Sequence, residues 1–365
     1  MFAQELVNWQ KVFGRHGLPW QGTQDPYKVW LSEIMLQQTQ VSTVIPYYER
    51  FIKKFPRVQL LAQAKEDEVL SLWAGLGYYA RARNLHRAAQ EVVSRFGGIF
   101  PENIDDLVSL PGIGLSTAHA IASFCFSKHT PIMDGNVKRV FARYYGIKGY
   151  DRHFEKVLWQ QAWENVDNLP DDFDMPAYTQ GLMDLGATIC TRTKPKCLTC
   201  PFKESCYAHL NNQQTSLPTP KPKKTVPLKE VYMLIVDTGH SVLLEKRKSS
   251  GIWGGLWSLP EFEQASQMKA FVQASFSGDA VLQKMAELTH KFSHYTLLIR
   301  PFYFSNPTEN RLSESVAYDY LQTLSKEDKP HFKYLDWDAL ETIGLPKPIQ
   351  DLLSWRVNDT QDVRK

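Results

Sequence analysis

The sequence has few cysteines, no long apolar run and no large excess of either charge. Its first residues, MFAQELVNWQKVFGRHG, lack the apolar core and the small-residue cleavage site of a secretory signal. No stretch of about 18 apolar residues occurs, which argues against a membrane span. The net charge of +3 combines a balance of +5 over residues 1–225 with −2 over residues 226–365. A soluble, cytoplasmic protein with no membrane partner is therefore expected. The excess of positive charge in residues 1–225 is only weak evidence for a polyanionic partner.

Apolar residues repeat with helical spacing through the first 210 residues. The segment DPYKVWLSEIMLQQTQV begins with Asp25 at a predicted N-cap and Pro26 at the first helical position. This pattern predicts an all-α region over 1–214. Further helices are predicted at 41–54, 66–73, 81–96, 103–109, 114–127, 135–145, 153–165 and 176–188.

The composition changes at TSLPTPKPKKTVPL, where four prolines and three lysines predict an extended linker over 215–228. Beyond it, VYMLIV and VLLEKR flank turn residues and predict a β-hairpin. The segments LLIRPFYF and HFKYL predict further strands, and helices are expected near 265–276 and 346–355. We therefore expect an α/β domain at 229–356 and a tail at 357–365.

Four of the five cysteines form a C-x6-C-x2-C-x5-C run at Cys190, Cys197, Cys200 and Cys206. Clustered thiols in a cytosolic protein indicate a metal or cluster site rather than disulfides. Tetrahedral zinc and a [4Fe–4S] cluster both accept four thiolates, and the spacing does not separate them. Arg192 lies with two lysines in the loop between the first two of these cysteines, where metal ligation would hold the cations in place as a phosphate contact.

The segment LPGIGLSTAHAIA places Gly112 and Gly114 in a tight turn between two predicted helices. Uncovered N–H groups at a helix N-terminus bind anions such as phosphate without reading bases, although such a turn alone is most often plain structure. Two carboxylates also stand out. Glu33 lies in an otherwise apolar helix and Asp134 precedes a new one, so the first can be a half-exposed glutamate and the second a simple N-cap.

These motifs together resemble the MutY family of adenine DNA glycosylases, within the helix-hairpin-helix superfamily that includes endonuclease III. The resemblance extends over the whole chain and is carried by SEIMLQQTQV, GLGYYARAR, LPGIGLSTA, DGNVKRV, DLGATICTRTKPKCLTCPFKESC and FSH. It implies a multidomain fold, in which an all-α glycosylase is followed by an α/β Nudix-like domain at 229–356. The all-α glycosylase would consist of a six-helix barrel at about 21–130 and an iron–sulfur module formed by 1–20 and 131–214.

The resemblance also implies a cofactor and a partner. The four cysteines would hold a [4Fe–4S] cluster, which decides the choice against zinc. The partner would be double-stranded DNA containing A:8-oxoguanine or A:G mispairs, so the protein would be nucleoid-associated. A monomer is expected because no apolar surface repeat indicates a dimer.

Roles for individual residues follow from the same resemblance. Glu33 takes the position of the acid that protonates N7 of the flipped adenine, for which burial must raise its pKa. Asp134, kept ionised, would stabilise the oxocarbenium-like sugar until water completes hydrolysis and leaves an abasic site. Lys138 lies one helical turn beyond Asp134. Ser116 stands where endonuclease III-type lyases carry a Schiff-base lysine, so a monofunctional glycosylase is expected.

Other residues match segments that the family places on DNA. Gln37, Gln38 and Tyr78 match residues that are inserted beside the mispair when the base is flipped. Gln180 matches a residue near the adenine pocket. Without the resemblance, Gln and Tyr at these places would be ordinary surface or core residues.

In the C-terminal part, Gly255 and Glu261 keep only the first half of a Nudix box, and the carboxylates that would bind Mg²⁺ are absent. A lesion-binding role is expected instead, because Phe292, Ser293 and His294 resemble the turn with which the family reads 8-oxoguanine.

Three other functions stay open. Ser116 and the C-terminal domain disfavour a bifunctional lyase, and the missing carboxylates disfavour a Nudix hydrolase. A non-catalytic DNA-binding or redox iron–sulfur protein would share the cysteine cluster and the hairpin, but it need not keep both Glu33 and Asp134.

Overall fold

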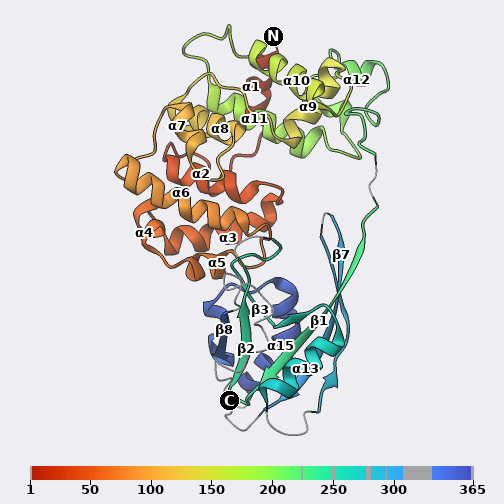
Figure 1. Ribbon diagram of the computed structural model, residues 1–365. Helices are drawn as coiled ribbons and strands as arrows, with labels where there is room; N and C mark the ends of the chain where they lie inside the picture. The colour runs from red at the N-terminus through yellow and green to blue at the C-terminus, as the bar shows by residue number, and fades with distance from the viewer. Residues whose placement is uncertain are drawn as a thin grey trace. The chain divides into compact units, whose positions relative to one another are not determined.

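The computed structural model describes residues 2–222, 225–248, 251–276, 281–292, 294–306 and 331–362. The chain divides into two compact units. Unit 1 comprises Met1–Gln63 and Asn84–Lys223, and unit 2 comprises Ala64–Arg83 and Lys224–Lys365. Figure 1 traces the chain through both units, from the N-terminus to the C-terminus.

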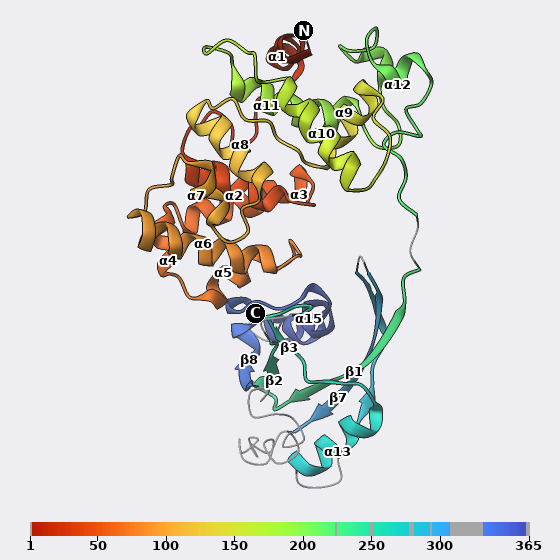
Figure 2. The same cartoon turned by 45° about the horizontal axis from the view of Figure 1, so that its top comes forward.

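Unit 1 is built from helices, as Figure 2 shows. They are α1 (Phe2–Phe13), α2 (Pro26–Leu36), α3 (Val41–Lys54), α4 (Val58–Gln63), α6 (Ala80–Phe96, whose first turn belongs to unit 2), α7 (Ile104–Ser109), α8 (Leu115–Phe126), α9 (Gly135–Tyr145), α10 (Arg152–Glu164), α11 (Met175–Asp184) with its π-helical extension η1 (Leu185–Ile189), η2 (Cys197–Thr199) and α12 (Tyr207–Leu210). The predicted helices of this part are confirmed, whereas α1, α4, η2 and α12 were not predicted.

Local chemistry explains how α2 begins. The carboxylate of Asp25 accepts a hydrogen bond of 3.0 Å from the backbone N–H of Tyr27, and Pro26 occupies the first helical position. Both features are those predicted from the sequence. The helix then presents a buried face that includes Trp30 and Leu31, each with no accessible surface, and this packing fixes where Glu33 lies.

A core formed by α1 and α9–α11 joins the N-terminus to helices more than 130 residues later. The ring of Phe2 stacks on that of Phe202 with centroids 4.5 Å apart. Gly181 on α11 allows α1 to approach closely, because a Cβ there would lie 3.0 Å from Cγ of Leu6. The segment after α1 is thereby held beside α11.

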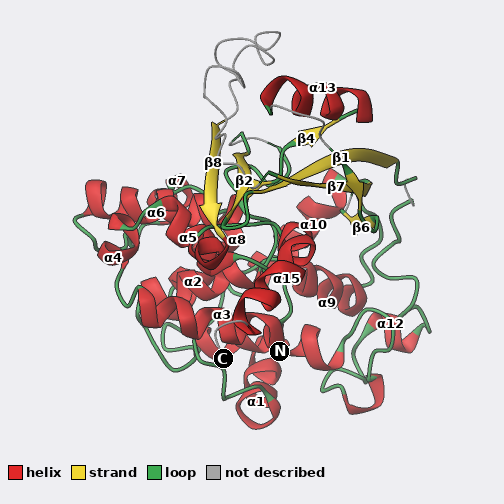
Figure 3. Cartoon of the chain, turned by 90° about the horizontal axis from the view of Figure 1, so that it is seen from below, coloured by secondary structure: helices red, strands yellow, loops and turns green. Residues whose placement is uncertain are grey.

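Unit 2 contains a mixed sheet with strand order β3-β2-β1-β7-β5, in which β4 pairs with β1, β6 with β7 and β8 with β2 (Figure 3). The predicted hairpin is confirmed as antiparallel β1 and β2, and β1 runs parallel to β7. The strands are β1 (Leu228–Asp237), β2 (Ser241–Lys246), β3 (Trp257–Ser258), β4 (Glu261–Phe262), β5 (Gln283–Lys284), β6 (Leu288–Lys291), β7 (Thr296–Ser305) and β8 (His331–Asp336).

Helices complete unit 2. Helix α13 (Ala265–Ser275) packs on β1 and β4, and its Phe271 is buried in a core with Leu234 and Leu243. Helix α15 (Lys347–Asp362) follows a 3-10 turn, η4 (Trp337–Thr342). The unit also includes α5 (Glu66–Trp73), whose Asp67 forms an ion pair with Lys246. Within the described ranges of the whole chain, no helix has both the length and the apolar character needed to cross a bilayer.

Candidate functional site

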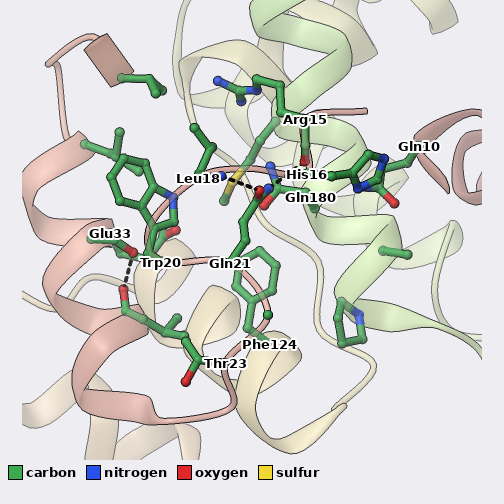
Figure 4. A pocket seen from close by; sticks show the side chains of 18 of the residues that line it. Gln10, Arg15, His16, Leu18, Trp20, Gln21, Thr23, Glu33, Phe124 and Gln180 are labelled. Carbon is green, nitrogen blue, oxygen red and sulfur yellow. Dashed lines mark hydrogen bonds between the residues drawn. The ribbon is translucent and has the colours of Figure 1, made fainter. Parts of the chain in front are cut away.

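A cavity of about 690 Å³ lies in unit 1 between the segment that joins α1 to α2 and the helices α2, α8 and α11. Its size is in the usual range for small-molecule sites. In Figure 4, Glu33 and Trp20 lie on the side of α2, whereas Gln180 lies on the side of α11. Phe124 of α8 adds an aromatic wall. The cavity thus combines apolar surface with a few polar groups from distant parts of unit 1.

Glu33 is the carboxylate that lines this cavity on α2. Burial raises the pKa of its carboxyl group to about 8, and the negative charge of Asp134 adds to the rise. Removing a carboxylate from water disfavours its ionised form, and a nearby negative charge acts in the same direction. Glu33 is therefore mostly protonated at neutral pH and can donate a proton to a group in the cavity.

Asp134 is the N-cap of α9, and its Oδ1 accepts a hydrogen bond of 2.7 Å from the backbone N–H of Val137. Its negative charge is close enough to act on Glu33, so the structure brings the two predicted carboxylates together. Asp134 is not among the described residues that line the cavity. It is both a helix cap and a neighbour of Glu33. Its position at a helix N-terminus favours the negative charge of its carboxylate.

Ser116 supports the segment that carries Asp134. Its Oγ accepts a hydrogen bond of 2.9 Å from the backbone N–H of Met133, the residue before Asp134. Lys138, by contrast, forms an ion pair with Glu155, with Nζ 2.7 Å from Oε1. Its amine is thus held by a carboxylate of α10, and its role as a DNA contact stays a prediction.

The glycine turn lies between α7 and α8, as a helix-hairpin-helix requires. Gly112 has a φ of +77°, and a Cβ there would lie 2.9 Å from Cβ of Asn84. Gly114 is the N-cap of α8, and a Cβ at this position would meet open space. Gly112 is therefore needed for the turn itself, whereas Gly114 leaves the N-terminus of α8 uncovered for an anion.

Two of the predicted DNA contacts have a left-handed backbone. Gln38 follows Gln37, the C-cap of α2, and has a φ of +57°, while Tyr78 in unit 2 has a φ of +50°. Residues other than glycine adopt this conformation at a cost, and it is frequent at functional sites. Gln38 is exposed and the side chain of Tyr78 is half-exposed, so both are available to a ligand.

The four clustered cysteines line one small cavity, to which Arg143 also contributes. None of them forms a disulfide, and Nη1 of Arg143 lies 3.4 Å from Sγ of Cys190. The residues thus fit a group that binds thiolates around a common centre. Among the described residues, however, no three Cys, His, Asp or Glu side chains converge as they would on a single metal ion.

The loop between Cys190 and Cys197 exposes the side chain of Arg192, together with Lys194 and Lys196. The carbonyl of Arg192 accepts a hydrogen bond of 3.0 Å from Arg143. The loop is therefore anchored through its backbone while its cations stay in solvent, which suits a contact with phosphates.

In unit 2, the predicted lesion-binding turn joins β6 to β7. The N–H of Phe292 donates a hydrogen bond of 2.9 Å to the carbonyl of Tyr295 and closes the turn. His294 is exposed there and its ring packs against Tyr295. Ser293 lies outside the described residues. Trp253 extends this aromatic cluster with its ring centroid 5.5 Å from that of Phe292.

The segment RHGLPWQ contributes Arg15, His16, Trp20 and Gln21 to the cavity, a role that was not predicted from the sequence. Residues 1–20 were expected to belong only to the iron–sulfur module. A signal was present, because this short loop between helices combines charged, amide and aromatic side chains. Gln180, which was predicted near the adenine pocket, does line the cavity.

The fold and the cavity are those of a helix-hairpin-helix base-excision glycosylase joined to a Nudix-like domain. Residues 31–164 match the HhH-GPD superfamily of base excision DNA repair proteins, and residues 231–355 match the NUDIX domain. Adenine DNA glycosylase of Buchnera aphidicola subsp. Baizongia pistaciae is 38% identical, over 97% of this chain and 96% of that protein. The enzyme of the same name from Rattus norvegicus is 36% identical, over 94% of this chain and 75% of that protein. The chain belongs to the adenine DNA glycosylase family.

A solved DNA glycosylase structure shares the fold of part of the chain. A thermostable thymine-DNA glycosylase superposes with a TM-score of 0.51 at 29% identity, covering 57% of this chain and 95% of that chain. The expected fold class is thus confirmed: a helical base-excision glycosylase followed by a Nudix-like domain with a mixed sheet.

Proposed function

We propose that this protein excises adenine mispaired with 8-oxoguanine or guanine in double-stranded DNA, hydrolyses the N-glycosidic bond and leaves an abasic site. Family membership supports the reaction, and one observation carries it: Glu33 lines the cavity with its pKa raised to about 8. A base stacked in a duplex cannot reach such a cavity, so the adenine must be flipped out.

The two carboxylates divide the chemistry. Glu33 protonates N7 of the flipped adenine, which allows the base to leave as a neutral molecule while the C–N bond breaks. Asp134 stabilises the positive charge that develops on the sugar, and water then adds at the anomeric carbon. Ser116 replaces the amine of the lyases, which supports a monofunctional enzyme.

DNA contacts follow the placement of the remaining residues. Gly112 and Gly114 present backbone N–H groups to a phosphate, and Gln38 and Tyr78 insert beside the mispair, with Gln37 and Lys138 supporting these contacts. The turn around Ser293 and His294 reads 8-oxoguanine. We propose that the protein acts as a monomer, with a catalytic region at 1–214, a linker at 215–228 and a lesion-recognition domain at 229–356.

The cysteine cavity would hold a [4Fe–4S] cluster through Cys190, Cys197, Cys200 and Cys206. When bound, the cluster contributes four strong metal–thiolate bonds that stabilise the fold around it. The chain's own residues would then hold Arg192 and its neighbouring lysines toward DNA phosphates. Iron and acid-labile sulfide analysis of the purified protein should give about four of each per chain, whereas one zinc per chain would refute the cluster.

Single-turnover cleavage of duplexes containing A:8-oxoguanine, A:G or A:T tests the proposed function. The wild type should release adenine from the two mispairs, and Glu33→Gln should bind the duplex while its cleavage falls by about 10²–10⁴-fold or more. Strand breaks should appear only after alkali, because the product is an intact abasic strand. Binding without any release of adenine by the wild type would support a non-catalytic DNA-binding protein instead.

A further inference from the structure

A buried carboxylate lies behind the wall of the cavity, and the mechanism above does not use it. Asp184 is the last residue of α11 and its accessible surface is 0%. It is not among the described residues that line the cavity, but Arg15 and Gln180, which do, both donate to it. Its Oδ1 accepts from Nε2 of Gln180 at 2.8 Å and from Nε of Arg15 at 2.7 Å, and its Oδ2 accepts from the backbone N–H of Arg15 at 2.8 Å.

Glycine at position 14 lets the chain pass close to Asp184. A Cβ at Gly14 would lie 2.5 Å from the carbonyl oxygen of Gln10 and 3.0 Å from Oδ2 of Asp184. The chain can therefore bring Arg15 onto the carboxylate only because residue 14 is glycine. A buried carboxylate requires such a partner, since desolvation without one is costly.

The chemistry of this contact fixes the orientation of Gln180. An ionised carboxylate only accepts hydrogen bonds, so the amide nitrogen of Gln180 must face Asp184. The amide oxygen is then directed away from Asp184. Because Gln180 lines the cavity on the side of α11, with Glu33 on the side of α2 (Figure 4), its oxygen is a hydrogen-bond acceptor for a base that enters.

We propose that Asp184 is a positioning residue that makes the cavity selective for a purine with a 6-amino group. The exocyclic amine of adenine donates to the oxygen of Gln180, whereas the 6-oxo group of hypoxanthine would place two acceptors against each other. A site built to bond a polar group rejects analogues that lack it, because its own group stays unpaired. This inference rests on the proposed function and names the group by which that function would select its base.

The test compares single-turnover cleavage of adenine, hypoxanthine and unsubstituted purine, each placed opposite 8-oxoguanine. Asp184→Ala removes the acceptor of all three bonds, so the amide of Gln180 is no longer held and can rotate. The ratio of the adenine rate to each analogue rate should fall by about tenfold relative to the wild type. Comparing ratios between enzymes cancels the intrinsic reactivity of each base, and a merely structural defect would slow all three substrates alike.

Two further variants keep the test decisive if Asp184→Ala does not fold. Gln180→Leu leaves the pair of Asp184 and Arg15 in place and should lower the same ratios to a similar extent. Asp172→Ala, the same chemical change at an exposed position just before α11, should leave them unchanged. In the double variant of Asp184 and Gln180, the ratios should fall no further than in either single variant.

The outcomes separate the two proposals. Wild-type cleavage of adenine with unchanged ratios in a folded Gln180→Leu protein, or in folded Asp184→Ala, would overturn the role of Asp184 and leave the proposed function standing. No cleavage of adenine by the wild type would overturn the proposed function and this inference together.

Discussion

Replacing Glu33 by glutamine should abolish cleavage and at the same time stabilise unit 1. Burial and the charge of Asp134 raise the pKa of Glu33 from 4.5 to about 8. The folded protein must therefore hold a proton that the unfolded chain releases above pH 4.5, and stability falls as the pH rises from there to about 8. At about 1.4 kcal/mol per pH unit, this penalty is roughly 1 kcal/mol at pH 5 and about 3 kcal/mol at pH 7.

Glutamine carries no charge at either pH, so Glu33→Gln should remove the penalty. Urea unfolding of the helical signal, followed by circular dichroism, should show that the variant gains about 1 kcal/mol over the wild type at pH 5 and about 3 kcal/mol at pH 7. Glu49→Gln is the matched control, because Glu49 is exposed on α3 and the same substitution should leave the pH dependence unchanged.

The two readouts of this variant must move in opposite directions. Catalytic sites often keep groups that reduce stability, so a loss of activity can accompany a gain in stability. A Glu33→Gln protein whose stability difference is the same at pH 5 and pH 7 would refute the burial argument. A variant that still cleaves at the wild-type rate would refute the role of Glu33 as the acid.

Three further predictions concern the same unit. The single-turnover rate of the wild type should fall as the pH rises through about 8, because Glu33 loses the proton that it donates; a rate that stays level to pH 9 would contradict this. Ser116→Ala should lower stability by about 1–3 kcal/mol in urea unfolding, since a backbone N–H loses its acceptor, and Ser116→Thr should restore it. Gly112→Ala should destabilise the protein by more than about 1 kcal/mol because residue 112 has a positive φ. Gly114→Ala should fold normally but bind DNA more weakly in a titration at fixed salt. Equal stability of the two variants would contradict the assignment of the turn.

Local patterns in the sequence account for much of the secondary structure. The apolar period predicts α2, α3 and α5 to α11, and Asp25 with Pro26 predicts where α2 begins, because an N-cap depends only on residues within one turn. The β1–β2 hairpin was predicted from its turn residues for the same reason. Helix α1 was missed although its spacing is helical, and segment 64–83 was not expected to group with the C-terminal unit.

The sequence by itself determined which residues can do chemistry: two carboxylates, four clustered thiols and a glycine turn are recognisable from residue type and spacing. Only the tertiary structure decided what surrounds them. Arg15 meets Asp184 across 169 residues of chain, and Lys138 meets Glu155 rather than staying in solvent. The pKa of Glu33 rises because of burial beside Asp134. Desolvation and charge–charge interactions depend on distances in space, which residue spacing does not specify beyond a helical turn or a hairpin.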